Sequence, residues 1–260
     1  MYPPPGYVEI EGSEVGNGDS WGWYVAVGRE NAQPVLCTTT HDAFAVLPVA
    51  CTPAAWPPAA DVDVDDPEEL LALDPRSPLG LVLAARAAVG SAAVERLIRP
   101  ALELLPEYAD AWLEVAVALR RQRRQAEALE AMLQAFTAPL AFGSHGVRER
   151  CFQWLRRAPD AALPGERDPI WLRRRELTLA QAVRWNDDYV HYGEAVEAYH
   201  ELGWGVRAVR LRMLIGELMS LETVSFQERY GWSAAGHAEK LRADVERAGL
   251  ERRLPLLAPR

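Results

Sequence analysis

The residues best suited to bind a metal ion lie in one acidic stretch, DVDVDD, which begins at residue 61. Its alternating carboxylates, from Asp61 to Asp65, have the spacing of the first ligands in an EF-hand calcium loop. Such a loop requires glycine at its sixth position and a bidentate glutamate at its twelfth, whereas this chain has Asp66 and Ala72 there. We therefore predict a solvated acidic linker over residues 61–77 and no metal site.

The histidines and cysteines do not form a catalytic pattern. No second histidine occurs before His145, so we interpret the pair His41-Asp42 as a turn with a local side-chain hydrogen bond. The other four histidines are interpreted as surface residues on separate helices, and Cys151 as an inert core thiol. No serine or cysteine has the sequence context of a nucleophile elbow. We accordingly predict no enzymatic activity, no catalytic residue and no cofactor.

Two glycines in the stretch GNGDSWGWY, Gly16 and Gly18, raise the alternative of a phosphate-binding loop. Such a loop opens a helix, and its motif continues with Gly-Lys-Ser or Gly-Lys-Thr. Here the glycines precede a strand-forming run, Trp21–Tyr24, and no such continuation follows. We predict instead that Asn17-Gly18 forms the tight turn of a β-hairpin.

Two arginine runs, Arg120–Arg124 and Arg173–Arg175, are candidates for binding an acidic partner. Each lies on a predicted helix, where positive charge near the C-terminal end also interacts favourably with the helix dipole. The chain has a net charge of −9, and the runs lack interleaved aromatic residues. We predict no nucleic-acid binding. An acidic peptide and the acidic N-terminal part of the same chain are the alternatives for these arginines.

Negative charge is concentrated at the N-terminal end of the chain. Residues 1–74 contain thirteen acidic side chains and a single basic one, Arg29. A field of one sign attracts partners of the opposite sign. This part of the molecule therefore favours a basic protein partner.

The composition is that of a globular protein, with 49% hydrophobic and 25% charged residues in 260. No apolar run reaches the roughly 20 residues that span a bilayer, and the N-terminus lacks the pattern of a signal peptide. Three cysteines at wide spacing do not make a disulfide framework or a zinc site. We expect a reduced, cytoplasmic protein without a membrane partner.

Alternating hydrophobicity predicts an antiparallel meander of four short strands within residues 1–60. In the first strand Val8 and Ile10 point to the core, while the acidic side chains between and after them point outward. In the second, the face with Trp21 and Trp23 forms the core, and the opposite face, with Gly22, leaves room for a close neighbour. The runs PVLCTTT and AFAVLPV, residues 34–40 and 43–49, supply the third and fourth strands.

From Pro78 onward the apolar spacing becomes helical and repeats at an interval of about 34 residues. Pro78, Leu81, Val82, Ala85, Val94, Ile98, Ala101 and Pro106 correspond to Trp112, Val115, Ala116, Leu119, Ala128, Met132, Ala135 and Pro139. A less regular third copy begins at Tyr192. This pattern resembles the tetratricopeptide repeat, which implies an α-solenoid of stacked helix pairs. Further helices are predicted at 68–73, 147–157, 170–185 and 233–249.

The N-terminal segment resembles the SUKH (Smi1/Knr4-like) superfamily of bacterial immunity and fungal regulatory proteins. The matching residues are Glu14–Asp19, Trp21–Tyr24, Pro34-Val35, His41-Asp42 and Ala50–Trp56. The resemblance implies a small β-rich domain in which Gly16, Gly18 and Gly22 serve chain reversal and close packing.

These patterns predict an α+β protein, with a SUKH-like domain at 1–60, the acidic linker at 61–77 and a tetratricopeptide-like helical domain at 78–260. The resemblances imply a non-enzymatic immunity-type protein that binds and occludes a partner, by analogy a basic toxin of nuclease or deaminase type. The alternative is an adaptor that binds a peptide or an assembly partner in its helical groove. The predicted partner-binding residues are the acidic Glu9, Glu11, Glu14 and Asp19 and the groove positions Arg86, Asp110, Arg120, Glu197 and His200.

Overall fold

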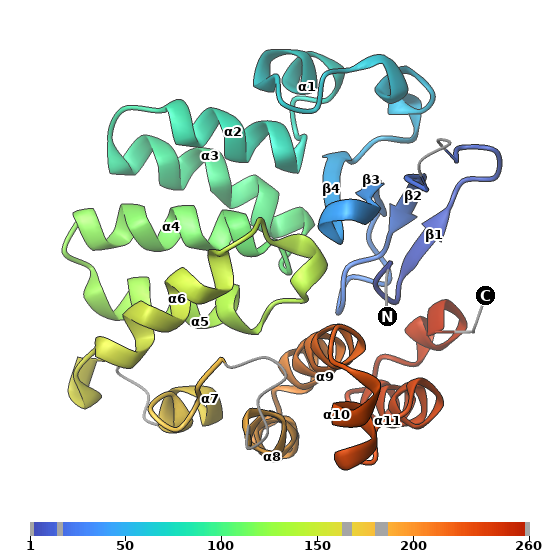
Figure 1. Cartoon of the computed structure of the whole chain (residues 1–260). Helices are drawn as coiled ribbons and strands as arrows, with labels where there is room; N and C mark the ends of the chain where they lie inside the picture. The colour runs from blue at the N-terminus through green and yellow to red at the C-terminus, as the bar shows by residue number, and fades with distance from the viewer. Residues whose placement is uncertain (1–2, 15–17, 163–167, 180–186, 258–260) are drawn as a thin grey trace.

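The computed structural model describes residues 3–14, 18–162, 168–179 and 187–257, and it combines one antiparallel sheet with many helices (Figure 1). The predicted α+β class is confirmed at this level. The strands are β1 Tyr7–Glu9, β2 Trp21–Tyr24, β3 Val35–Thr40 and β4 Ala45–Ala50. The α-helices are α1 Pro67–Leu73, α2 Pro78–Ala87, α3 Ser91–Leu104, α4 Ala109–Arg121, α5 Gln125–Thr137, α6 Val147–Arg157, α7 Pro169–Arg173, α8 Asp188–Glu201, α9 Gly205–Ser220, α10 Val224–Arg229 and α11 Ala234–Arg247. Short 3-10 helices are η1 His41–Ala43, η2 Pro53–Ala55, η3 Pro58–Asp61, η4 Leu140–Phe142, η5 Asp160–Ala162 and η6 Glu251–Leu257.

The sheet is an antiparallel meander in the order β1-β2-β3-β4, as the sequence predicts. The predicted tight turn between the first two strands is wrong, because the connection from β1 to β2 runs over residues 10–20. Gly18 has a φ of 90°, a left-handed conformation that glycine adopts without a steric penalty. Asn17 lies outside the described residues.

Both faces of the sheet are buried, whereas the sequence predicts a core on the Trp21 face alone. Trp21 packs with Leu36 and Val49 in a cluster that η2, η3 and α1 complete. On the opposite face Tyr7 and Tyr24 belong to the main helical core. The prediction that Val8 points to the core is also wrong, because Tyr7 is buried and Val8 is 42% exposed. A sheet covered on both sides has no polar face, so alternation alone misassigns it.

The close neighbour expected at Gly22 is the ring of Tyr7. A Cβ atom on Gly22 would lie 2.4 Å from Tyr7 Cζ and 2.6 Å from the carbonyl oxygen of Val8. We expect Gly22→Ala to lower the free energy of unfolding by about 2 kcal/mol, because overpacking here forces the backbone of β1 away. Urea denaturation measures the change. Gly193→Ala, at a helical glycine with no atom within 4 Å, is the control and should leave stability unchanged or slightly raised; equal effects at both positions would contradict the prediction.

The helix pairs α2–α3 and α4–α5 coincide with the 34-residue repeat, and most corresponding positions are buried, whereas Pro106 and Trp112 are partly buried. Val94 and Ala128 are both buried, as are Ala101 and Ala135. Consecutive helices from α2 to α6 pack on one another, and α8, α9 and α11 form a second group (Figure 1). Small side chains at the repeated positions allow the helices to approach closely.

The predicted helix at 170–185 is wrong over its described part, because α7 ends at Arg173. The guanidinium of Arg174 donates to the carbonyl oxygen of Trp171 at 2.8 Å. It also donates to the carbonyl oxygen of Leu155 at 3.1 Å. The side chain of the buried Arg174 thus bonds to a carbonyl oxygen that would accept from a backbone N–H if the helix continued. Residues 180–186 lie outside the described residues.

The sheet is joined to helices from the middle and from the C-terminal part of the chain. The fully buried carboxylate of Glu107, just before α4, accepts from the Tyr24 hydroxyl at 3.1 Å and from the Val27 backbone N–H at 2.5 Å. From the C-terminal end, Val27 packs against α9 and α11. The predicted linker, residues 61–77, contains α1, whose Leu70 is buried against the Trp21 face. The predicted boundaries near 60 and 78 stay predictions.

Candidate functional site

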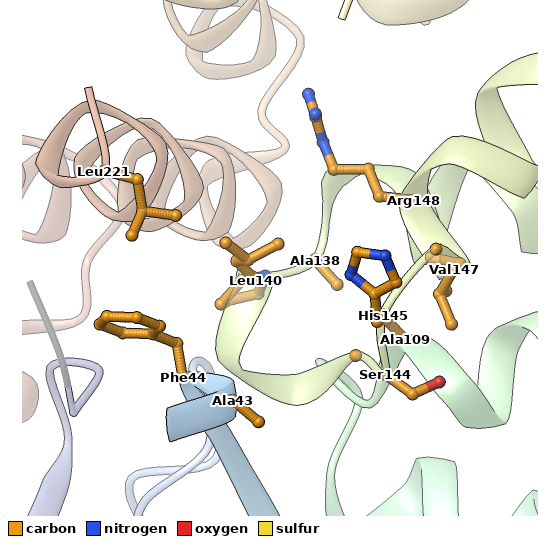
Figure 2. A pocket seen from close by; sticks show the side chains of 14 residues that line it. Ala43, Phe44, Ala109, Ala138, Leu140, Ser144, His145, Val147, Arg148 and Leu221 are labelled. Atoms are coloured by element: carbon orange, nitrogen blue, oxygen red, sulfur yellow. The ribbon is translucent and has the colours of Figure 1, made fainter. Parts of the chain in front are cut away.

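Two adjoining hollows, which we call together the junction cleft, have volumes of 240 and 390 Å³; the smaller lies where the sheet meets the helices, and the larger lies among the helices beside it. Both are lined by Leu140, His145 and Arg148. Figure 2 shows the smaller hollow, with Phe44 and Leu221 facing each other on one side of Leu140 and with His145 on the other. The cleft is built by the turn before β4, η4, the start of α6 and the end of α9, with further lining residues from α4, α5 and the segment after α7.

The position of η4 follows from the residues on either side of Leu140. Phe142 is buried, with its ring centroid 4.4 Å from that of Tyr24, which fastens η4 to the sheet. Gly143 passes so close to α4 that a Cβ atom there would lie 3.1 Å from Ala109 Cβ. Asp110 then accepts hydrogen bonds from the backbone N–H and the hydroxyl of Ser144, each at 2.6 Å. These contacts fix the loop that leads into α6.

Phe44 places an aromatic ring at the edge of the cleft at a conformational cost. Its φ of 50° lies in the left-handed region, which bulky side chains rarely adopt. Burial does not explain this conformation, because the side chain is 47% exposed. Leu221, across the hollow, is 44% exposed. The two side chains give the cleft an apolar mouth.

Arg148 is the main positive charge of the cleft. Its Nη2 atom donates to the hydroxyl of Tyr192, and its guanidinium lies 4.7 Å from the ring centroid of Phe136. Its Nε atom is buried without a hydrogen-bond partner. None of the ion pairs within the described residues supplies Arg148 with a carboxylate. A partly buried cation without a counter-ion favours binding of an anion.

The start of α6 adds to the positive potential beside Arg148. Its N-cap residue, Gly146, has a φ of 83° and provides no side-chain cap for the first helical N–H groups. The positive end of the helix dipole therefore points to the loop that contains His145. His145 is exposed and lines both hollows.

Behind Leu140 lies a buried acid, Glu217 on α9. It accepts from the backbone N–H of Leu140, whereas its other carboxylate oxygen has no partner in the described structure. Burial raises the pKa of Glu217 to about 7, and the N–H groups of Leu140 and Ala141 partly oppose this rise. The side chain therefore holds η4 in place and changes its charge near neutral pH.

The predicted acidic contact residues lie in β1 and in the connection from β1 to β2. Glu9, Glu11 and Glu14 are exposed, and Asp19 is half-buried. The predicted linker adds more carboxylates beside them, because Val62 and Val64 pack into the same apolar cluster as Ile10 and Trp21. We call this region the acidic face; its exposed acids are Glu9, Glu11, Glu14, Asp61, Asp63, Asp65, Glu68 and Glu69.

Three of the predicted groove residues lie along α2 and α4. The Arg86 guanidinium pairs with Asp110 at 2.5 Å and with Glu114 at 2.9 Å. Asp110 is buried and already bonded to Ser144, so it supports the loop and is not open to a partner. Arg120 is exposed, and its guanidinium lies 4.3 Å from the ring centroid of Trp154.

The other two groove predictions, Glu197 and His200, belong to one charged network in the C-terminal helices. The His200 side chain is 2% exposed and its Nε2 atom lies 3.0 Å from a carboxylate oxygen of Asp244. Asp244 also accepts from Arg212 at 2.6 Å, and Glu197 pairs with Arg247 at 2.6 Å. Glu197 is exposed, whereas His200 is not open to a partner.

Two histidines predicted at the surface are therefore buried, His200 and His237. Burial lowers the pKa of His237 to about 4, and Arg212 adds to this effect. Gly216 makes room for the imidazole, since a Cβ atom there would lie 2.3 Å from His237 Nε2. The core assignment of Cys151 is confirmed, and burial raises the pKa of its thiol to about 12.

The arginine runs differ in their surroundings. In the second, Arg173 pairs with Glu194 at 2.6 Å, and Arg174 is buried. In the first, Arg124 pairs with Glu95 and Glu127, whereas Arg120, Arg121 and Arg123 are exposed. The described ion pairs of these runs involve carboxylates between residues 95 and 194 and none from residues 1–74.

Sequence reasoning missed the junction cleft. The available signals were the short GSHG loop at residues 143–146 and the single phenylalanine between β3 and β4. Over the part of the chain that is described, no group of three or more His, Cys, Asp or Glu side chains is arranged to hold a metal ion. None of the described helices has the length and apolar character needed to traverse a bilayer.

Comparison with known proteins places similarity at both ends of the chain. Residues 1–67 match the model of the YfbP N-terminal domain, and residues 183–254 match that of the YfbP C-terminal domain. The chain is 28% identical over 241 residues to "Uncharacterized protein YfbP" of Escherichia coli strain K12, an alignment that covers 89% of this chain and 84% of that protein. The N-terminal match covers the sheet and the acidic stretch, and the C-terminal match covers α8 to α11.

Proposed function

We propose that this protein is a non-enzymatic binding protein whose acidic face holds a basic partner protein, as an immunity-type protein does. The observation that carries the proposal is that the carboxylates are exposed while the apolar residues between them pack into the core. Val62, Val64 and Ile10 pack into the core, while the acids between and beside them are exposed. Such a surface attracts a basic partner and sets the salt dependence of its binding.

In this proposal the helices form the support of the acidic face. The repeated burial in α2 to α5 supports a tetratricopeptide-like stack, which keeps its shape because each helix pair packs on the next. The resemblance of residues 14–56 to SUKH proteins supports occlusion of a toxin as the biological role. The partner would be a basic nuclease or deaminase.

The test is affinity capture from the native cell with two matched variants. The first carries Glu9→Gln, Glu11→Gln, Asp61→Asn and Asp65→Asn, which neutralise four acids of the acidic face. The control neutralises four exposed acids of the helices: Glu103→Gln, Glu201→Gln, Glu228→Gln and Glu239→Gln. Both variants change the net charge by the same amount, so a difference between them reports the location of the charge.

We expect the wild-type protein and the control to capture the same basic protein, and the acidic-face variant to bind it at least about tenfold more weakly. Calorimetry of the purified pair should show affinity falling steeply as salt rises from about 0.05 to about 0.3 M. A partner that binds both variants equally, with no salt dependence, would contradict the proposal.

A second candidate function is an adaptor for an acidic peptide. It is favoured by the exposed arginines at the C-terminal end of α4 and, beside it, of α6: Arg120, Arg121, Arg123, Arg156 and Arg157. Replacing all five with glutamine should then abolish capture of an acidic partner and leave the binding of a basic partner unchanged. The capture experiment thus distinguishes the two functions.

A further inference from the structure

We propose that the junction cleft binds the C-terminus of a peptide, with its terminal carboxylate at Arg148 and His145 and an apolar last side chain at Phe44, Leu140 and Leu221. The inference is independent of the acidic face, because the cleft is formed by η4, α6, α9 and the turn before β4. The junction cleft is thus a second site, and its ligand is an anion, whereas the ligand of the acidic face is a basic protein.

The charge of the cleft selects a carboxylate. Arg148 is partly buried and takes part in none of the ion pairs within the described residues. Its Nε atom is buried and its Nη2 atom donates to the Tyr192 hydroxyl, so Nη1 is the nitrogen left to meet a ligand. The uncapped start of α6 adds positive potential at the same place. Glu149 lines the larger hollow only, and it is exposed, so solvent screens its repulsion.

The apolar part of the cleft selects the side chain beside that carboxylate. Phe44 and Leu221 face each other on one side of Leu140 (Figure 2). The smaller hollow, at 240 Å³, has room for one aliphatic or aromatic side chain and not for a large cofactor. The left-handed backbone of Phe44 keeps its ring at the mouth, and strain of this kind is typical of ligand-binding positions.

A peptide C-terminus satisfies both parts of the cleft at once. Its last residue carries a carboxylate and a side chain on the same Cα atom, so the two groups reach adjoining subsites without further linkage. Its preceding backbone can leave through the larger hollow, which Thr178 and Gln153 line with polar groups. The backbone continues on both sides of an internal acidic residue, so the cleft would have to hold two chain segments beside the carboxylate instead of one.

The test is equilibrium dialysis of the purified full-length protein against two peptide pools. Each pool contains acetylated hexapeptides Ser-Gly-Ser-Gly-Ala-Φ, in which Φ is Leu, Ile, Val, Met or Phe. One pool has free carboxylates and the other is amidated. The peptides have no other charge, so the acidic face does not contribute. Retained peptides are identified and quantified by mass spectrometry.

We expect the wild-type protein to retain free-carboxylate peptides with a dissociation constant below about 1 mM and the amides at least about tenfold more weakly, since a charge-assisted hydrogen bond is lost. Arg148→Gln should weaken binding by about tenfold, and Leu221→Ser should abolish the preference for apolar last residues. Arg150→Gln, at an exposed arginine on the same helix but outside the cleft lining, is the matched control and should bind as the wild type does.

Three results would overturn the proposal: no retention of either pool at about 1 mM peptide, equal retention of acids and amides, or loss of binding in Arg150→Gln as large as in Arg148→Gln. Competition by free 4-methylpentanoate as strong as by the peptides would overturn the assignment to a peptide, because it would identify a small-molecule site. Circular dichroism spectra of all variants establish that the fold is retained, and Leu221→Ser changes an exposed side chain at the end of α9.

Discussion

Replacing Arg253 with alanine is expected to lower the free energy of unfolding by about 4 kcal/mol. The reason is that the substitution removes a fully buried guanidinium that donates to several acceptors. Arg253 lies in η6 and donates to the carbonyl oxygens of Val25 at 2.8 Å and Pro5 at 2.7 Å. It also lies 3.4 Å from a carboxylate oxygen of Glu30. The substitution leaves these part-buried acceptors without their donor.

The size of this effect reflects the place of Arg253 in the fold. Its contacts join the C-terminal end of the chain to the segment before β1 and to the segment after β2. Gly6 allows this approach, since a Cβ atom there would lie 2.6 Å from Arg253 Nη2. A lysine cannot reach several acceptors with one planar group, so Arg253→Lys should recover less than half of the lost stability.

Urea or guanidinium denaturation measures the loss at Arg253. The neighbouring Arg252 is exposed and bonds to the side chain of Asn31 at the surface, which makes Arg252→Ala the matched control. We expect the control to change stability by less than about 1 kcal/mol. Similar losses at the two positions would show that burial of Arg253 is not the cause.

Replacing Glu217 with glutamine is expected to change how stability depends on pH. Burial raises the pKa of Glu217 in the folded protein to about 7, whereas a glutamate in the unfolded chain titrates near its usual value of 4.5. The stability that the neutral side chain contributes is therefore complete below about pH 4.5 and is lost as the pH rises through 7. A shift of this size corresponds to about 3 kcal/mol.

Glutamine keeps the oxygen that accepts from Leu140 and does not ionise. The difference in free energy of unfolding between Glu217→Gln and the wild type should therefore shift by about 3 kcal/mol in favour of the variant between about pH 4 and pH 8. Chemical denaturation at a series of pH values measures this difference. Glu103→Gln, at an exposed acid of α3, should show no such trend.

The buried His237 acts in the opposite direction over an overlapping range. Its pKa falls to about 4 in the folded protein, so the stability contributed by the neutral imidazole is present above its usual pKa of 6.5 and is lost as the pH falls through 4. Both proteins in the comparison contain His237, so its contribution cancels in the difference. A pH-independent difference would show that the Glu217 carboxylate does not titrate as the structure implies.

Several elements were predictable because their signals are local. The four strands and the helices at 68–73, 147–157 and 233–249 all occur close to the predicted residues. The repeat positions Val94, Ala101, Ala128 and Ala135 are buried as the 34-residue interval predicts. Each of these signals depends on the period of apolar residues in a short window, and that period reflects secondary structure directly.

Errors arose where a contact from elsewhere in the chain overrides the local pattern. Tyr7 turns inward because it packs over Gly22, which leaves Val8 outside. The helix expected beyond Arg173 ends because the Arg174 side chain takes a carbonyl of the last turn. His200 is buried because Asp244, 44 residues away, supplies its partner. No window of local sequence contains these partners.

The α+β composition, the order of the elements and the acidic character of the first 74 residues could be predicted, since these depend on residue type and spacing alone. Only the folded structure established that the sheet is covered on both faces and that Arg253 of η6 bonds to the segment before β1. It also decided that Phe44, Leu140, Arg148 and Leu221 line one cleft. The physical reason is that burial and charge pairing depend on distances between segments far apart in the chain, which no local periodicity encodes.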